Sequence, residues 1–322
     1  MTKPIIYMVI PCYNEEEVLP ETHKRLAEKY DALVAADAIS KESKIVFVND
    51  GSKDKTWELI SEYEAEHSYF AGINLSCNRG HQNALMAGLT TVRDFADAVI
   101  SMDADLQDDI NAIDEMVAKF TEGFDVVYGV RSSRTTDTFF KRFTAQTYYK
   151  LLAHLGANLV YNHADYRLMS RRAIEGLMEF SEVNLFLRGV VPMVGFKSCE
   201  VYYERAKRFA GESKYPLKKM IALALDGITS LSVEPIRLIM RMGMFSVFVG
   251  IVLLIYSVVR YFQGQVVAGW ASLMVSLWFI GGMLMTSIGI VGEYVGKIYM
   301  ETKERPRFIV AETVGLPEKE ND

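Results

Sequence analysis

Short apolar runs alternate with longer segments of mixed polarity over the first part of the chain. The apolar runs lie at residues 5–10, 45–49, 72–76, 98–102 and 126–129, and each is typical of a buried strand. The segments between them have the length and the pattern of amphipathic helices. This alternation predicts an α/β fold with a mainly parallel sheet that helices cover on both faces.

A polar cluster follows each of the first four predicted strands. The four clusters are Tyr13-Asn14-Glu15, Asp50-Gly51-Ser52, Asn78-Arg79-Gly80 and Asp103-Ala104-Asp105. Ligands of open α/β sheets bind beyond the carboxyl ends of the strands, so we expect these clusters to converge on one cleft. The chain has neither a G-x-G-x-x-G motif nor a P-loop, and the polar clusters are therefore the main candidates for ligand contacts.

The most apolar part of the chain comes late. Residues 242–259 contain no Asp, Glu, Lys or Arg, and after Arg260 a second uncharged stretch covers residues 261–292. A membrane-spanning helix needs about 20 apolar residues, so the first stretch predicts one span and the second predicts a turn at residues 263–269 and another span. Two buried helices of a soluble core are the alternative, but uncharged runs of this length favour lipid.

Basic residues flank both predicted spans. Arg237 and Arg241 precede the first span, and the second is followed by Lys297, Lys303, Arg305 and Arg307. Because positive charge accumulates on the cytoplasmic side of spans, both ends of the hairpin are expected to face the cytosol.

The chain is therefore expected to have three parts. Residues 1–235 form a cytosolic domain whose residues 195–235 are a basic segment beside the membrane. Residues 236–296 form a two-helix transmembrane hairpin, and residues 297–322 form a cytosolic tail. Between Lys197 and Lys219 the basic segment has seven Lys or Arg against three Glu. A solvated helix face is one interpretation, but a basic segment beside a membrane favours phosphate binding.

Composition narrows the function classes. The chain has 35 Lys and Arg against 41 Asp and Glu, a net charge of −6, which argues against a nucleic-acid partner. The three cysteines, Cys12, Cys77 and Cys199, form no C-x-x-C pair, so neither a disulfide framework nor a zinc cluster is predicted.

Two carboxylates stand out as candidate metal ligands. Asp103 and Asp105 leave the strand at residues 98–102 at alternate positions, and oxygen ligands of this kind suit Mg²⁺ or Mn²⁺ completed by substrate phosphates. Acidic pairs in turns are more often solvated or cap a helix, but the apolar strand before this pair favours a buried site. Asp50 is a candidate for contact with the base or ribose of a nucleotide, if Ser52 or Asp54 caps the next helix.

Six ordered motifs together resemble a known family. They are Pro11-Cys12-Tyr13-Asn14-Glu15-Glu16, Asn49-Asp50-Gly51-Ser52, Asn78-Arg79-Gly80-His81, Asp103-Ala104-Asp105-Leu106-Gln107, Gly129-Val130-Arg131 and Asp165-Tyr166-Arg167-Leu168. The chain resembles the family 2 glycosyltransferases, and most closely the bacterial polyprenyl-phosphate glycosyltransferases, which are undecaprenyl-phosphate glucosyltransferase-like relatives of dolichol-phosphate mannose synthase. The resemblance covers nearly the whole chain and implies a nucleotide-sugar-binding domain of the GT-A type followed by two spans. One departure is Asn49, where many relatives have Asp.

The resemblance also implies residue roles. Nucleotide binding falls to Pro11, Tyr13, Glu15, Asp50 and Asp103. The metal ligands, for Mg²⁺ or Mn²⁺, are Asp103 and Asp105. Phosphate binding falls to Arg131, Arg205, Arg208, Ser213 and Lys214. Contact with acceptor or sugar falls to Gln107 and Arg167, and the catalytic residues are Asp105 and Asp165.

The expected reaction is the inverting transfer of one sugar from a nucleotide sugar to undecaprenyl phosphate at the bacterial inner membrane. UDP-glucose is the favoured donor, with UDP-N-acetylglucosamine and GDP-mannose as alternatives. A lipid phosphate is largely ionised at neutral pH, with a second pKa of about 6, so strong base catalysis is not required. Asp165 is expected to orient the acceptor or the metal, and the alternatives are that it acts as a base or simply pairs with Arg167. A processive polysaccharide synthase is one alternative. It is expected to have more spans and a Q-x-x-R-W motif, and this chain has neither. A non-catalytic membrane scaffold that binds a nucleotide sugar is the remaining alternative, and the resemblance implies a homo-oligomer such as a tetramer.

Overall fold

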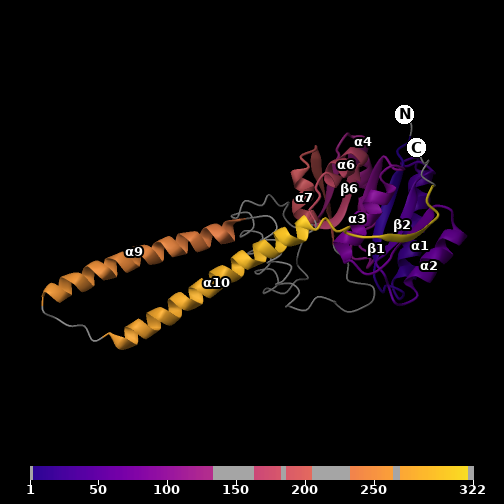
Figure 1. The fold of residues 1–322 in the computed structure, drawn as a ribbon. Coiled ribbons are helices and arrows are strands. Elements are labelled where there is room, and N and C mark those ends of the chain that lie inside the picture. The colour runs from indigo at the N-terminus through magenta and orange to yellow at the C-terminus, as the bar shows by residue number, and fades with distance from the viewer. Residues whose placement is uncertain (1–2, 133–162, 183–185, 205–232, 264–268, 318–322) are drawn as a thin grey trace. The chain divides into compact units, whose positions relative to one another are not determined.

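The computed structural model describes residues 3–132, 163–182, 186–204, 233–263 and 269–317, which include all the labelled elements of Figure 1. The chain divides into two compact units. One consists of Met1–Leu223 together with Pro306–Asp322, and the other is Ala224–Arg305. The first unit contains the sheet, and the second contains two long helices.

A sheet of eight strands forms the centre of the first unit, in the order β7-β5-β6-β4-β1-β2-β3-β8. Its strands are β1 (Ile6–Cys12), β2 (Lys44–Asn49), β3 (Phe70–Leu75), β4 (Ala98–Ser101), β5 (Val126–Arg131), β6 (His163–Ser170), β7 (Ser198–Tyr203) and β8 (Val310–Val314). Strand β1 pairs in parallel with β2 and β4, β2 with β3, and β5 with β7, whereas β6 and β8 run antiparallel to their neighbours. The predicted mainly parallel sheet is confirmed.

Burial on both faces explains why the parallel strands are continuous apolar runs. Along β1, Met8 packs into one core cluster and Val9 into the other, because successive side chains of a strand point to opposite faces. The first cluster lies under α1 (Leu19–Ala35), α2 (Thr56–Glu66) and α4 (Ala112–Thr121). The second lies under α3 (His81–Val92), α6 (Arg171–Met178) and α7 (Leu187–Met193).

Three of the strands were not predicted. The antiparallel β6 lies between β4 and β5 and contains Asp165 and Arg167. Strand β8 comes from the region expected to be a separate tail, and it pairs with β3 in a register that sets Thr313 opposite Ile73. Its side chains are largely exposed, so its sequence lacks the apolar run that marks a buried strand.

The second unit consists of α9 (Glu234–Phe262) and α10 (Trp270–Thr302), and the predicted turn at residues 263–269 lies between them. Both helices are long and apolar enough to cross a membrane, with apolar windows at Pro235–Val252 and Phe279–Thr302 whose side chains are not buried in the protein. The helices are longer than the uncharged stretches, because each continues into flanking residues that include charges.

Candidate active site

The loops that follow β1 and β2 are joined by reciprocal hydrogen bonds. The backbone N–H of Asn14 donates to Ser52 Oγ at 3.0 Å, and the backbone N–H of Lys53 donates to Asn14 Oδ1 at 2.9 Å. Asn14 has φ of 52°, a left-handed conformation that Asn adopts more readily than most residues. Two of the four predicted polar clusters therefore lie together.

Asp50 joins the loop after β2 to the loop after β3. Its Oδ1 accepts from the backbone N–H of Arg79 at 2.7 Å, and its Oδ2 accepts from that of Gly80 at 2.9 Å. Burial raises the pKa of Asp50, and the two backbone N–H groups oppose that effect. The sequence suggested a carboxylate free to contact a nucleotide, whereas the structure shows one that holds the loop in front of α3.

Gly51 allows these two loops to come close. It has φ of 61°, and a Cβ at this position would lie 2.5 Å from the backbone nitrogen of Asn78 and 2.6 Å from the carbonyl carbon of Cys77. Only glycine fits this position without movement of the backbone.

The loop after β4 presents Asp103 and Asp105 differently. Thr22 Oγ1 on α1 donates to the Ala104 carbonyl at 2.8 Å, which fixes the loop between the two carboxylates. The side chain of Asp103 is 35% exposed, whereas Asp105 is buried and its Oδ1 accepts from the backbone N–H of Gln107 at 3.2 Å. Asp103 is thus the more accessible of the two to a ligand.

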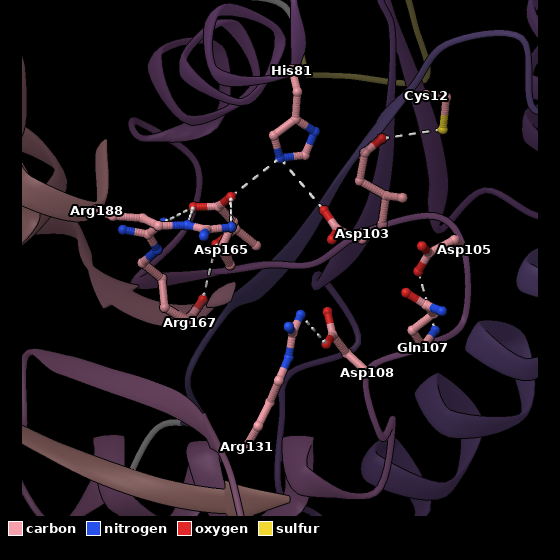
Figure 2. Close-up of polar contacts among 12 residues, drawn as sticks. Cys12, His81, Asp103, Asp105, Gln107, Asp108, Arg131, Asp165, Arg167 and Arg188 are labelled. Carbon is pink, nitrogen blue, oxygen red and sulfur yellow. Dashed lines mark hydrogen bonds and ion pairs between the residues drawn. The ribbon is translucent and has the colours of Figure 1, made fainter. Parts of the chain in front are cut away.

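His81, the first residue of α3, lies between two carboxylates (Figure 2). Its Nε2 is 3.5 Å from Asp103 Oδ1 and 3.7 Å from Asp165 Oδ2. Burial lowers the pKa of His81, but its hydrogen bond to Asp165 and the negative charges of Asp103 and Asp165 outweigh burial and raise the pKa to about 9. At neutral pH His81 is therefore a cation that connects the loops after β3 and β4 with β6.

Asp165 is surrounded by positive charge. Arg167 Nη2 donates to its Oδ1 at 2.6 Å, and Arg188 of α7 donates from Nη2 to Oδ2 at 3.0 Å. Burial alone would raise the pKa of Asp165, but Arg188, His81 and Arg167 hold it well below the usual range. A carboxylate stabilised in this way is a poor proton acceptor, so the structure favours the pairing alternative for Asp165.

Arg167 lies in the core. Its side chain is 2% exposed, and its guanidinium is directed at Asp165. Nη1 has no hydrogen-bond partner among the described residues. This position leaves little of Arg167 for direct contact with an acceptor or a sugar.

The other predicted site residues are placed as follows. Pro11 is buried in β1, and Tyr13 beyond it is exposed. The backbone N–H of Glu15 donates to Thr56 Oγ1 at 3.0 Å. Arg131 ends β5, where its guanidinium lies near Asp108 and Tyr203. The predicted phosphate ligands in the basic segment lie outside the described residues: Arg205, Arg208, Ser213 and Lys214.

Sequence reasoning missed Arg188. It lies within residues 186–194, where it is the only charged residue. A lone charge in an apolar segment usually needs a partner, which is the signal that identifies it. The backbone N–H of the preceding Leu187 donates to Gln82 Oε1 at 2.9 Å, so α7 is attached to α3 beside His81.

Asp103 and Asp105 suit a divalent cation. Both supply carboxylate oxygens from one loop, and the exposed Asp103 carboxylate is open to a ligand. Among the described residues no group of three or more His, Cys, Asp or Glu is arranged to hold a metal. A hard cation here would therefore take its other ligands from substrate phosphates and water, as Mg²⁺ commonly does.

A cavity of about 590 Å³ lies beside the loop after β4. It is lined by α1 residues that include Arg25 and Lys29, by Leu106 and residues 108–111, and by Glu204. Asp50, Asp103 and Asp165 do not line it. The cavity therefore borders the loop of Asp103 and Asp105 at Asp108 and does not include the carboxylates around His81.

The chain matches two family profiles. Residues 7–178 match Glycosyl transferase family 2, and residues 234–298 match the GtrB C-terminal hairpin. The first match, together with the mainly parallel sheet, confirms the GT-A type of fold that the resemblance implies.

Similar proteins cover nearly the full chain. The Bacillus subtilis (strain 168) protein named Uncharacterized glycosyltransferase YkoT is 51% identical over 309 residues, which are 96% of this chain and 92% of that protein. The Bactoprenol glucosyl transferase of Shigella phage SfX is 39% identical over 310 residues, which are 95% of this chain and 98% of that protein. Among solved structures, the mannosyltransferase PcManGT from Pyrobaculum calidifontis in complex with GDP-Man and Mn²⁺ is 14% identical. That alignment covers 93% of this chain and 85% of the other, with a TM-score of 0.45.

Proposed function

Because the chain belongs to Glycosyl transferase family 2 and carries a GtrB C-terminal hairpin, we propose that it transfers one sugar from a nucleotide sugar to undecaprenyl phosphate. UDP-glucose is the favoured donor. Relatives named bactoprenol glucosyl transferase that match 95% of this chain support both the acceptor and the sugar.

One cluster of charged side chains supports this function most directly. His81 joins Asp103 to Asp165, and Arg188 joins Asp165 to α7, at the edge of the sheet where the carboxyl ends of the parallel strands lie. The partly exposed Asp103 carboxylate and Arg188 guanidinium on one edge suit a substrate that contains a metal-bound diphosphate.

Asp103 and Asp105 would hold Mg²⁺ or Mn²⁺ together with the donor diphosphate. When bound, the cation would neutralise the negative charge that develops on the leaving diphosphate. Tyr13 and Glu15, beside the loop after β2, would contact the nucleoside, and Arg131 would contact a phosphate.

The acceptor phosphate needs no strong base. It is largely ionised at neutral pH, since its second pKa is about 6. Its oxygen would attack the anomeric carbon directly and invert the configuration. Asp165 then serves to hold His81 and Arg188 in place, because three cations already engage its carboxylate.

The hairpin fits an acceptor that stays in the membrane. Helices α9 and α10 would cross the bacterial inner membrane, with the first unit and both ends of the chain in the cytosol. The basic residues beside the spans, Arg237 and Arg241 on one side and Lys297 and Lys303 on the other, favour this orientation. A homo-oligomer, for which a tetramer is one candidate, remains a prediction.

The decisive experiment uses the full-length protein purified in detergent. Undecaprenyl phosphate is incubated with Mg²⁺ or Mn²⁺ and with labelled UDP-glucose, UDP-N-acetylglucosamine or GDP-mannose, and the label in the lipid fraction is counted. We expect metal-dependent labelling from UDP-glucose. Labelling from another donor alone would correct the sugar and keep the reaction.

A matched pair of variants tests whether the reaction needs the carboxylate of Asp105. Asp105→Asn removes one candidate metal ligand, whereas Asp31→Asn changes an exposed residue of α1. We expect the first to abolish labelling and the second to leave it unchanged. Retained UDP binding with no labelling from any donor in the wild-type protein would favour the non-catalytic scaffold.

A further inference from the structure

Three side chains from three elements meet where β5 and β7 end. Arg131 and Tyr203 are register partners at the ends of these parallel strands. The Tyr203 hydroxyl donates to Asp108 Oδ1 at 2.5 Å and accepts from Arg131 Nε at 3.4 Å. Arg131 Nη2 also lies 3.9 Å from the same Asp108 oxygen (Figure 2). Tyr203 therefore links Arg131 to the loop that contains Asp103 and Asp105.

The three residues differ in their access to solvent. The side chain of Arg131 is 21% exposed, whereas those of Asp108 and Tyr203 are almost completely buried. Asp108 also lines the cavity of about 590 Å³, but its side chain and that of Tyr203 present almost no surface, so Arg131 is the member with surface available to a substrate.

The buried carboxylate is not explained by packing. Burial, with Asp103 nearby, raises the pKa of Asp108 to about 6, against the opposing effects of Tyr203 and Arg131. Its Oδ2 has no hydrogen-bond partner among the described residues. Burying a carboxylate costs free energy when one of its oxygens has no hydrogen bond. The presence of Asp108 here therefore indicates a role other than filling space.

The surroundings hold this arrangement rigidly. The Tyr166 hydroxyl donates to the Asp109 carbonyl at 3.0 Å, and its ring packs edge-on against Tyr203 with ring centroids 5.3 Å apart. The Tyr203 carbonyl accepts from the backbone N–H of Ser132 at 2.9 Å. Neither end of the link can move far without breaking these contacts.

We propose that Tyr203 and Asp108 are positioning residues that hold the Arg131 guanidinium in the orientation required to bind a substrate phosphate. This inference rests on the proposed function, which gives Arg131 its ligand. A guanidinium binds two phosphate oxygens only when its plane is correctly oriented, so a fixed plane strengthens binding. The phosphate belongs either to the donor diphosphate or to the lipid acceptor.

Tyr203→Phe tests the link with little change in packing, and Tyr202→Phe is its matched control. The first removes the hydroxyl that contacts Arg131 and Asp108, and the second removes an exposed hydroxyl of the same strand that contacts Glu200. We expect Tyr203→Phe to raise KM for one substrate about tenfold with a smaller change in kcat, and Tyr202→Phe to leave KM near the wild-type value. Titrating the donor and the lipid separately identifies which phosphate Arg131 binds.

A double-mutant cycle with Arg131→Ala tests whether Tyr203 acts through Arg131. If it does, Tyr203→Phe has no further effect once Arg131 is gone. Additive effects, or equal effects of Tyr203→Phe and Tyr202→Phe, would overturn the proposal. Asp108→Asn keeps the shape of the carboxylate, and it should raise the same KM. It provides a second test if Tyr203→Phe does not fold.

Direct measurement of ligand binding distinguishes failure of this inference from failure of the proposed reaction. Calorimetric titration of UDP, and of undecaprenyl phosphate in detergent, into the full-length variants needs no turnover. Weaker binding of the same ligand by Arg131→Ala, Tyr203→Phe and Asp108→Asn supports the link even if no sugar is transferred. Unchanged binding of both ligands overturns the link even if the wild-type enzyme is active.

Discussion

Arg188 meets Asp165 at two points, with Nη2 3.0 Å from Oδ2 and Nε 3.4 Å from Oδ1. Arg167 contacts the same carboxylate from within the core. The geometry makes Asp165 the carboxylate that Arg167, Arg188 and His81 share, and of these three cations Arg167 is almost fully buried.

Asp165→Asn should therefore lower stability as well as activity. Loss of one partner of a buried ion pair typically costs about 3–5 kcal/mol, because the remaining charge stays buried. Melting of the detergent-solubilised protein measures this effect, and Asp114→Asn is the control, since it removes an exposed carboxylate that pairs with Lys29. A general base without a structural role would lose activity and keep its Tm.

Gly51→Ala and Gly80→Ala should differ in severity although both glycines have positive φ. A Cβ at Gly51 would meet the backbone of residues 77 and 78, whereas a Cβ at Gly80 would meet nothing within 4 Å. We expect Gly80→Ala to cost about 1–3 kcal/mol from backbone strain alone, because its φ of 87° and ψ of 155° lie in a region almost restricted to glycine. Gly51→Ala should cost more and weaken UDP binding. Equal melting temperatures for the two variants would contradict this ranking.

Asp125 should make stability depend on pH. A hydrogen bond from Arg172 is the main cause that lowers the pKa of Asp125, and Ser170 adds to it, while burial opposes both. The pKa of Asp125 in the folded protein is therefore below its unfolded value of about 3.9. Ionised Asp125 stabilises the fold above about pH 3.9, and this stabilisation is lost as the pH falls through the folded pKa.

The corresponding variant is Asp125→Asn. Its Tm should be several degrees below that of the wild type at pH 7, and the difference should close as the pH falls below about 4. Arg172 is largely exposed, so added salt should also narrow the difference. A difference that stayed constant down to pH 3 would show that the ion pair contributes nothing.

Deleting residues 309–322 should destabilise the first unit. The deletion removes β8 and leaves the hydrogen-bonding groups along the edge of β3 uncovered. We expect a lower Tm and faster hydrogen exchange of β3 amides, with Glu312→Ala, an exposed side chain of β8, as the control. Unchanged exchange in β3 would show that β8 does not protect this edge.

The sequence patterns located the buried parallel strands well and the others poorly. All five predicted strands end within two residues of their observed limits, because burial on both faces leaves only apolar residues in them. Strand β6 was missed because Asp165 and Arg167 interrupt its apolar pattern, and β8 because its side chains are largely exposed.

The candidate site was predicted at the level of loops and not of contacts. Motifs after the strands indicated where Asp50 and Asp103 would lie, and the family resemblance alone indicated Asp165. Which groups they contact depends on elements distant in sequence: α7 supplies Arg188, and the loop after β3 supplies the N–H groups that bind Asp50. Such partners are set by tertiary packing, which local patterns do not contain.

Strand β8 also determines the order in which the protein can be completed during synthesis. The ribosome makes residues 224–305 before it makes β8, so the edge of β3 stays open until both long helices have been made. The two-helix hairpin is thus inserted in the sequence of the first unit, because residues of that unit both precede and follow it. A single proteolytic cut between the two units would leave fragments that the β3–β8 pairing still holds together.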